Sequence, residues 1–159
     1  MNAGSIRHLR VAFAGAPFWA LVIAASAYTA PLLRGWQTQE HFARIVAMFG
    51  IGGLLAFPLG FYLAKRLAKQ RRPEARFAAA LLGFALATVA MTALLYVLDY
   101  RDYYSEWHEP PFTKIWFKEL LVTAAAALYQ FAALGMRLFF PVGFCALFAV
   151  AVWFVRLPH

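Results

Sequence analysis

The chain has 159 residues, of which 64% are hydrophobic, and a formal net charge of +8 at pH 7. Soluble domains are usually about 45–50% apolar, so this composition excludes an ordinary water-soluble domain and favours an integral membrane protein. Membrane proteins concentrate Lys and Arg in their cytoplasmic loops, and this accounts for the charge without a nucleic-acid partner. Cys145 is the only cysteine, which excludes an intramolecular disulfide and a cysteine-based metal site.

Three apolar runs in the first two thirds of the chain each have the length of a membrane-spanning helix, about 20 residues. They cover residues 11–33, 43–64 and 77–98. A later apolar tract, residues 120–155, is interrupted at 135–143 by GMRLFFPVG. Because Gly and Pro break helices, we predict two further spans at 115–137 and 140–156. Pro141 is expected in the first turn of the last span, where its missing N–H costs little.

The predicted fold is therefore an all-α, polytopic integral membrane helix bundle with five hydrophobic helices, forming a single transmembrane domain over residues 1–159. One alternative stays open, in which residues 115–137 form a helix lying in the membrane interface and only four helices span. The two alternatives differ at the end of the chain. Five spans place Arg156 outside, whereas four spans place it in the cytoplasm.

The charge pattern predicts the orientation of the bundle. Residues 65–76, KRLAKQRRPEAR, carry six basic side chains against Glu74, and the N-terminus adds Arg7 and Arg10. Loops rich in Lys and Arg stay in the cytoplasm. We therefore predict a cytoplasmic N-terminus and a cytoplasmic basic loop at 65–76, in a bacterial inner membrane.

This orientation places residues 34–44 and a loop at 99–114 outside, and Arg137 at a cytoplasmic turn between the last two predicted spans. Residues 99–119 hold five of the seven acidic residues, interleaved with aromatic ones. Aromatic side chains at a membrane surface either seat the protein among the headgroups or act as binding hot spots. We predict an ordered external recognition surface, with the candidate residues Asp102, Tyr103, Tyr104, Glu106, Trp107, His108 and Glu109.

Small residues recur every four positions in the second predicted span, at Gly52, Ala56 and Gly60. Such a stripe lets two helix backbones approach closely in lipid, where packing has to replace the hydrophobic effect. Glycine is costly to keep on a surface that only faces lipid. The stripe therefore predicts a helix–helix contact.

Four polar side chains lie on or close to one face of the predicted helix at 115–137. Thr123, Gln130 and Arg137 recur at seven-residue spacing, and Glu119 lies beside them. Polar side chains at depth normally face a neighbouring helix or a cavity. The stripe indicates interhelical hydrogen bonds, a polar pathway or a seam for a partner protein, and it also suits an interfacial helix with its polar side toward water.

The sequence contains no recognisable catalytic, cofactor-binding or metal-binding motif. No His, Asp or Glu lies at mid-span, which argues against haem ligation and against ion-coupled transport. The external group of Asp102, Glu106, His108 and Glu109 matches no metal-ligand spacing. We therefore expect no catalytic residue, no cofactor and no metal.

The resulting hypothesis is a non-enzymatic accessory or assembly subunit of a larger membrane complex. Its expected partners are membrane lipid and another membrane protein, or a second copy of the chain in a homo-oligomer. A small oligomeric transporter or lipid-linked substrate carrier is the second hypothesis. An enzyme with a site at the outer membrane face is the third.

Overall fold

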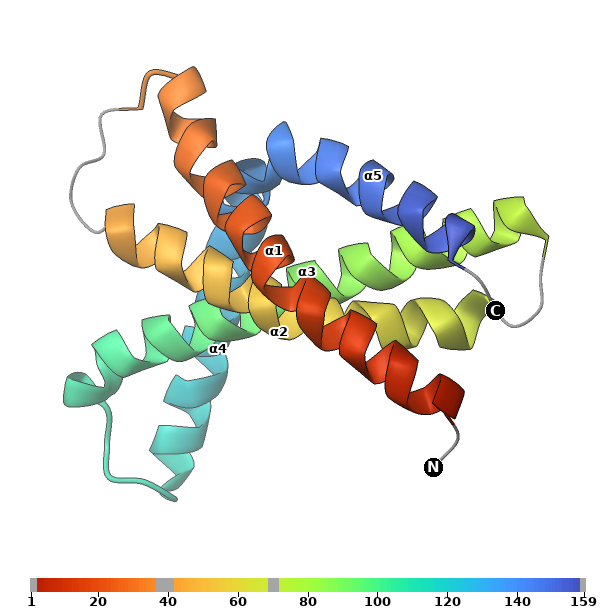
Figure 1. Cartoon of the computed structure of the whole chain (residues 1–159). Coiled ribbons are helices and arrows are strands. Elements are labelled where there is room, and N and C mark those ends of the chain that lie inside the picture. Colours follow the sequence, from red (N-terminus) through yellow and green to blue (C-terminus); the bar gives the residue numbers. More distant parts are fainter. Residues whose placement is uncertain (1–2, 37–41, 69–71, 158–159) are drawn as a thin grey trace.

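The computed structural model describes residues 3–36, 42–68 and 72–157, with side chains from Val11 onward. These ranges contain five α-helices and two short 3₁₀ helices (Figure 1). They are α1 (Ala3–Leu33), α2 (Phe42–Ala68), α3 (Pro73–Tyr104), η1 (Ser105–Trp107), α4 (Lys114–Ala133), η2 (Gly135–Phe139) and α5 (Val142–Arg156). The prediction of an all-α fold with five helices is confirmed.

Within the described ranges, three helical segments are long and apolar enough to cross a membrane: Val11–Leu33, Phe42–Ala68 and Pro73–Trp107. The apolar helix α5 is shorter. Its 15 residues rise about 22 Å, whereas the hydrocarbon core of a bilayer is about 30 Å thick. By helix length and composition the protein fits a multi-pass membrane protein, with three long apolar helices and one short one.

The helix α2 packs between α1 and α3, and its glycines bring the backbones of α2 and α3 together. A Cβ built on Gly52 would lie 2.5 Å from Thr92 Oγ1, and one built on Gly60 would lie 3.0 Å from the Cα of Phe84. On the facing helix, a Cβ on Gly83 would lie 2.8 Å from the backbone nitrogen of Ala64. Only a residue without a side chain fits at these crossings.

The three residues of the predicted packing stripe, Gly52, Ala56 and Gly60, are all buried. Ala56 has no exposed surface. The other face of α2 contacts α1, where a Cβ on Gly53 would lie 3.1 Å from the Cβ of Ile23. Close contacts on both faces of α2 make these three helices one packed unit.

Polar side chains inside the bundle bind one another. Trp19 Nε1 donates to Thr88 Oγ1 over 3.1 Å, and the hydroxyl of Thr92 donates to the carbonyl oxygen of Thr88 over 2.8 Å. In the described part of the chain, every buried side-chain nitrogen or oxygen has a hydrogen-bond partner. The bond between Trp19 and Thr88 joins α1 to α3, whereas the Thr92 bond lies within α3. Together with the other bonds they leave no buried side-chain polar atom of the described residues unsatisfied.

The part of the chain that follows α4 passes once along the bundle. Near its start, η2 lies at the end of α1, where Arg34 Nη1 donates to the carbonyl oxygen of Arg137 over 3.0 Å. Near its finish, α5 lies at the start of α3, where Arg76 Nη2 donates to the carbonyl oxygen of Phe154 over 3.3 Å. The start of α1 and the finish of α5 lie at the same end of the bundle (Figure 1).

We call the end that holds Lys65, Arg76 and Arg156 the basic end, and the opposite end, with Asp99 and Trp107, the acidic end. The helix α4 stays near the acidic end. It packs on α3 and, through Phe131, on Phe49 of α2, with a ring-centroid separation of 6.4 Å. The segment formed by η2 and α5 therefore takes the chain from the acidic end to the basic end.

The prediction that Arg137 and residues 34–44 lie on opposite sides of the membrane is wrong, because Arg34 binds Arg137. The length of the apolar tract at 120–155 suggests two crossings. In the structure, however, Ser26 of α1 holds the joint between η2 and α5. Its Oγ donates to the carbonyl oxygen of Leu138 over 2.9 Å and accepts from the N–H of Gly143 over 3.0 Å. Ser26 lies only two helical turns from the end of α1, so α5 starts close to the acidic end.

The predicted loop at 99–114 begins too early, because α3 continues through Tyr104. Its last turns stack Tyr96 on Tyr100 and Tyr100 on Tyr104, with ring centroids 6.4 and 4.8 Å apart. Aromatic pairs four residues apart stabilise a helix, and they extend α3 past the first acidic residues.

The connection predicted at 65–76 is also shorter than expected, because the two neighbouring helices continue into it. Its first four residues belong to α2 and its last four to α3, with Pro73 in the first turn of α3. Residues 69–71 lie outside the described ranges. Pro141 caps α5 instead of lying in its first turn, and the α-helix predicted at 115–137 stops at Ala133.

Candidate functional site

A helix–turn–helix at the acidic end carries most of the acidic residues. It consists of the last turns of α3, η1, the connection at 108–113 and the first turns of α4. We call residues 99–119 the aromatic turn. It projects from the bundle beside α4 (Figure 1), so its contacts with the rest of the chain determine whether it has a fixed shape.

Short local bonds start α4 and fix the turn. The hydroxyl of Thr113 accepts from the N–H of Trp116 over 3.1 Å, the usual N-cap bond. The carboxylate of Glu119 accepts from the N–H of Glu109 over 3.0 Å. The guanidinium of Arg101 lies 5.4 Å from the ring centroid of Trp116, a cation–π contact between α3 and α4.

His108 links the turn to α4. Its Nε2 lies 3.2 Å from Thr123 Oγ1. The single hydroxyl proton of Thr123 is committed to the carbonyl oxygen of Glu119, 2.6 Å away. In the tautomer with its proton on Nε2, His108 donates to Thr123, so that the hydroxyl of Thr123 bridges the imidazole and the carbonyl oxygen of Glu119.

The carboxylates of the turn do not converge. Asp102, Glu106 and Glu109 all belong to exposed residues. In the described ranges, no group of three His, Cys, Asp or Glu side chains is placed to hold a metal ion. The charge of the turn is spread over its surface, where it can meet a basic partner but does not form a coordination site.

Three of the predicted recognition residues form one aromatic cluster. The ring centroids of Tyr103 and Trp107 are 5.7 Å apart, those of Tyr104 and Trp107 are 5.9 Å apart, and those of Tyr103 and Tyr104 are 5.1 Å apart. Despite this contact, Tyr103 remains 61% exposed and Trp107 64% exposed. The cluster is therefore held in place while much of its apolar surface stays uncovered.

Phe112 adds a further exposed ring on the other side of the turn. It is 83% exposed, and its backbone has a φ of 70°. This left-handed conformation is unfavourable for a bulky residue. Strained, exposed residues of this kind cluster at binding sites.

The predicted polar stripe divides into two parts. Glu119 accepts from the N–H of Glu109, and Thr123 contacts the ring of His108. Gln130 Oε1 accepts from the hydroxyl of Tyr96 over 3.1 Å, which joins α4 to α3. Arg137 lies in η2, beyond the end of α4, and does not share this face. The part of the stripe on α4 thus forms a seam within the chain.

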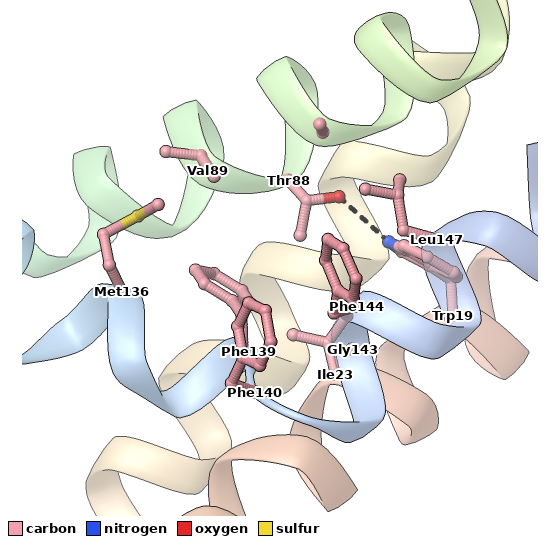
Figure 2. Close-up of a pocket in the computed structure, with 11 residues that line it drawn as sticks. Trp19, Ile23, Thr88, Val89, Met136, Phe139, Phe140, Gly143, Phe144 and Leu147 are labelled. Carbon is pink, nitrogen blue, oxygen red and sulfur yellow. Dashed lines mark hydrogen bonds between the residues drawn. The ribbon is translucent and has the colours of Figure 1, made fainter. Parts of the chain in front are cut away.

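A small cavity of about 170 Å³ lies where η2 and α5 meet α1 and α3. Figure 2 shows its walls, in which rings from η2 and α5 face Trp19 and Thr88. Its lining includes Ile23, Val89, Met136, Phe139 and Phe144. The N–H of Trp19 is already bonded to Thr88, so the hydroxyl of Thr88 is the polar side-chain group that this apolar cavity still offers.

Sequence reasoning missed Ser26, whose two hydrogen bonds hold η2 and α5 against α1. The signal was present, because a Ser deep in an apolar helix usually binds a neighbouring helix. It also missed Tyr96 as the partner of Gln130, a pairing that depends on the packing angle of α4. No protein-family model matches the chain, and searches of curated proteins and of solved structures find no match either.

Proposed function

We propose that the protein crosses a bacterial inner membrane four times, with its basic end in the cytoplasm. On this proposal α1, α2 and α3 each cross the bilayer, η2 and α5 together make the fourth crossing, and α4 stays near the acidic end. The rise of α5 alone is too short for a span, and the contact between Arg34 and Arg137 keeps η2 near the acidic end. Basic residues then collect on the cytoplasmic side, as in most membrane proteins.

We further propose that the protein is a non-enzymatic accessory or assembly subunit, and that the aromatic turn recognises another membrane protein outside the bilayer. The observation that carries this proposal is a pre-ordered turn with uncovered rings. Trp107 and Tyr103 stay largely exposed although Glu109, His108 and Arg101 tie the turn to α4. A rigid aromatic surface binds with little loss of conformational entropy.

The transporter hypothesis draws no comparable support. Every buried side-chain nitrogen or oxygen of the described ranges already has a hydrogen-bond partner. The cavity where η2 and α5 meet α1 and α3, and a larger one between α1 and α5, are lined almost entirely by apolar side chains. An enzyme at the outer face would need converging acids, bases or nucleophiles, and the acidic residues of the turn do not converge.

The proposal is tested in cells by replacing the exposed aromatic residues Tyr103 and Trp107 with alanine. The full chain carries a photocrosslinking residue at Glu106, and covalent adducts are purified and identified by mass spectrometry. Tyr103→Ala with Trp107→Ala is expected to reduce a specific adduct at least tenfold, since truncating a hot spot costs about 2 kcal/mol or more. His108 is left intact because it holds the turn in place.

Phe13→Ala is the matched control. Phe13 is an exposed ring on α1, outside the aromatic turn, and its loss should leave the adduct unchanged. Protein amount in the membrane is measured for every variant. If the double variant keeps its adduct, or loses it only in proportion to its own abundance, the turn is a lipid anchor and the recognition proposal fails.

A further inference from the structure

A second cavity, of about 620 Å³, opens between α1 and α5. It is lined by Val11, Ala14, Gly15, Phe18, Trp19 and Val22 of α1, by Phe57 of α2, and by Ala146, Ala149, Val150 and Trp153 of α5. The two helices diverge toward the basic end (Figure 1). We call this cavity the α1–α5 groove.

We propose that the α1–α5 groove binds one acyl chain of an anionic phospholipid, whose phosphate lies among the side chains of the basic end. This inference uses the placement of the bundle in a membrane and does not depend on the aromatic turn.

The length of the groove matches one leaflet. Its α1 wall runs from Val11 to Val22, a rise of about 16 Å along the helix. Half of a hydrocarbon core is about 15 Å thick. On the proposed placement, a chain that enters at the basic end would therefore reach the far end of the groove near the middle of the bilayer.

The cross-section of the groove favours a lipid chain over a protein helix. A helix is about 10 Å wide, so about 620 Å³ accommodates only about 8 Å of its length, less than two turns. Small residues line both walls, including Ala14 on α1 and Ala149 on α5. A slender, flexible chain can fill such a space along its whole length.

Two basic side chains lie near Trp153, at the end of the groove that faces the basic end. Arg76 reaches the carbonyl oxygen of Phe154, the residue after the groove-lining Trp153. Lys65 Nζ lies 5.9 Å from the ring centroid of Phe61, and that ring lies 6.3 Å from the ring of Trp153. Both cations are thus within one side chain of the groove.

These cations have no carboxylate partner in the described ranges, where the one ion pair is Arg44 with Asp99 at the acidic end. The nearest acid along the chain is Glu74, in the first turn of α3. Basic pockets between helices on the cytoplasmic side are the usual sites for anionic lipid headgroups. A phosphodiester would supply the missing negative charge.

The test compares two lipids on the purified full chain in nonionic detergent, by native mass spectrometry with phosphatidylglycerol or phosphatidylcholine carrying the same acyl chains. One phosphatidylglycerol is expected to stay bound in preference to phosphatidylcholine. Lys65→Gln with Arg76→Gln should weaken this binding about fivefold for each charge removed. Lys114→Gln with Lys118→Gln, at the acidic end, is the charge-matched control and should have no effect.

A second pair of variants separates the groove from simple surface attraction. Ala149→Phe fills the groove and should abolish the bound phosphatidylglycerol, whereas Ala90→Phe, on an exposed position of α3 outside the groove, should not. Ala14→Phe repeats the test from the opposite wall if the first variant loses helical content.

Three results would overturn the proposal. Equal retention of the two lipids would show that charge does not select the occupant. Full binding by Ala149→Phe and Ala14→Phe would place the lipid outside the groove. Loss of a dimer in the groove-filling variants, without loss of lipid, would make a second copy of the chain the occupant.

Discussion

The backbone of Phe112 has a left-handed conformation, with a φ of 70°. Residues other than Gly adopt this conformation only at a cost of about 1–2 kcal/mol. Pro110 and Pro111 precede it and limit the paths that the chain can take toward the N-cap at Thr113. The ring gains little burial in return, since its one aromatic neighbour is Trp116 at 5.7 Å. The conformation therefore displays the ring at a local cost in stability.

A comparison of Gly and Ala at two positions tests this strain. Because Gly accepts a positive φ, Phe112→Gly should be more stable than Phe112→Ala by about 1 kcal/mol. At the exposed, helical Phe117 the order should reverse, with Phe117→Gly less stable than Phe117→Ala by about 1 kcal/mol. Equilibrium unfolding in mixed detergent micelles measures all four. The same order at both positions would mean that Phe112 is not strained.

At the scale of elements, the joint between η2 and α5 depends on one hydroxyl. Ser26 is fully buried, and it binds both the carbonyl oxygen of Leu138 and the N–H of Gly143. Without it, two backbone groups would be left unsatisfied inside an apolar bundle. Such groups are costly because lipid offers them no replacement partner.

Ser26→Ala should therefore destabilise the protein by about 1–2 kcal/mol, near the upper limit for polar contacts between membrane helices. Thr29→Ala is the matched control one turn away. Thr29 donates only to the carbonyl oxygens of Ala25 and Ser26 in its own helix, so its loss should cost less than about 0.5 kcal/mol. If the two variants lose similar amounts of unfolding free energy, Ser26 does not hold the joint in the way described.

The helices themselves were predictable because their signal is local. Runs of apolar residues fix α1, α2 and α3, and the Gly- and Pro-bearing stretch at 135–143 fixes a break between α4 and α5. The path of the chain after that break was not predictable. It depends on Ser26 meeting Gly143, a contact between residues 117 positions apart. The end of α3 was missed because stacking among Tyr96, Tyr100 and Tyr104 outweighs the acidic residues between them.

The candidate site was likewise predictable where the signal is local and not where it depends on packing. Exposed aromatic residues at 99–119 could be identified from composition, but the role of His108 could not. Its contact with Thr123 depends on the position of that hydroxyl on α4, which exists only once α4 has formed and packed against the turn. No sequence pattern could have predicted the α1–α5 groove, because small and apolar residues like those of its lining occur throughout the chain.

For the molecule as a whole, four crossings place both termini on one side. A green fluorescent protein fused to the C-terminus should be fluorescent, and alkaline phosphatase fused there should be inactive, as expected of a cytoplasmic end. Insertions at Ser105 should give the opposite pair of results, and insertions at Gln70 should match the C-terminus. Active phosphatase at the C-terminus would restore the five-span arrangement.

The length of α3 has a consequence for where the aromatic turn can work. Its 32 residues rise about 48 Å, whereas a bilayer with its headgroups is about 40–45 Å thick. On the proposed placement, with the start of α3 at one surface, the length of α3 would bring Tyr103 and the following Trp107 just clear of the opposite surface. A bilayer thicker by a few ångströms would submerge these rings, and a thinner one would lift them into water. We expect the protein to engage its partner in membranes of limited thickness, so that lengthening the lipid chains of a reconstituted bilayer would switch recognition off without altering the protein.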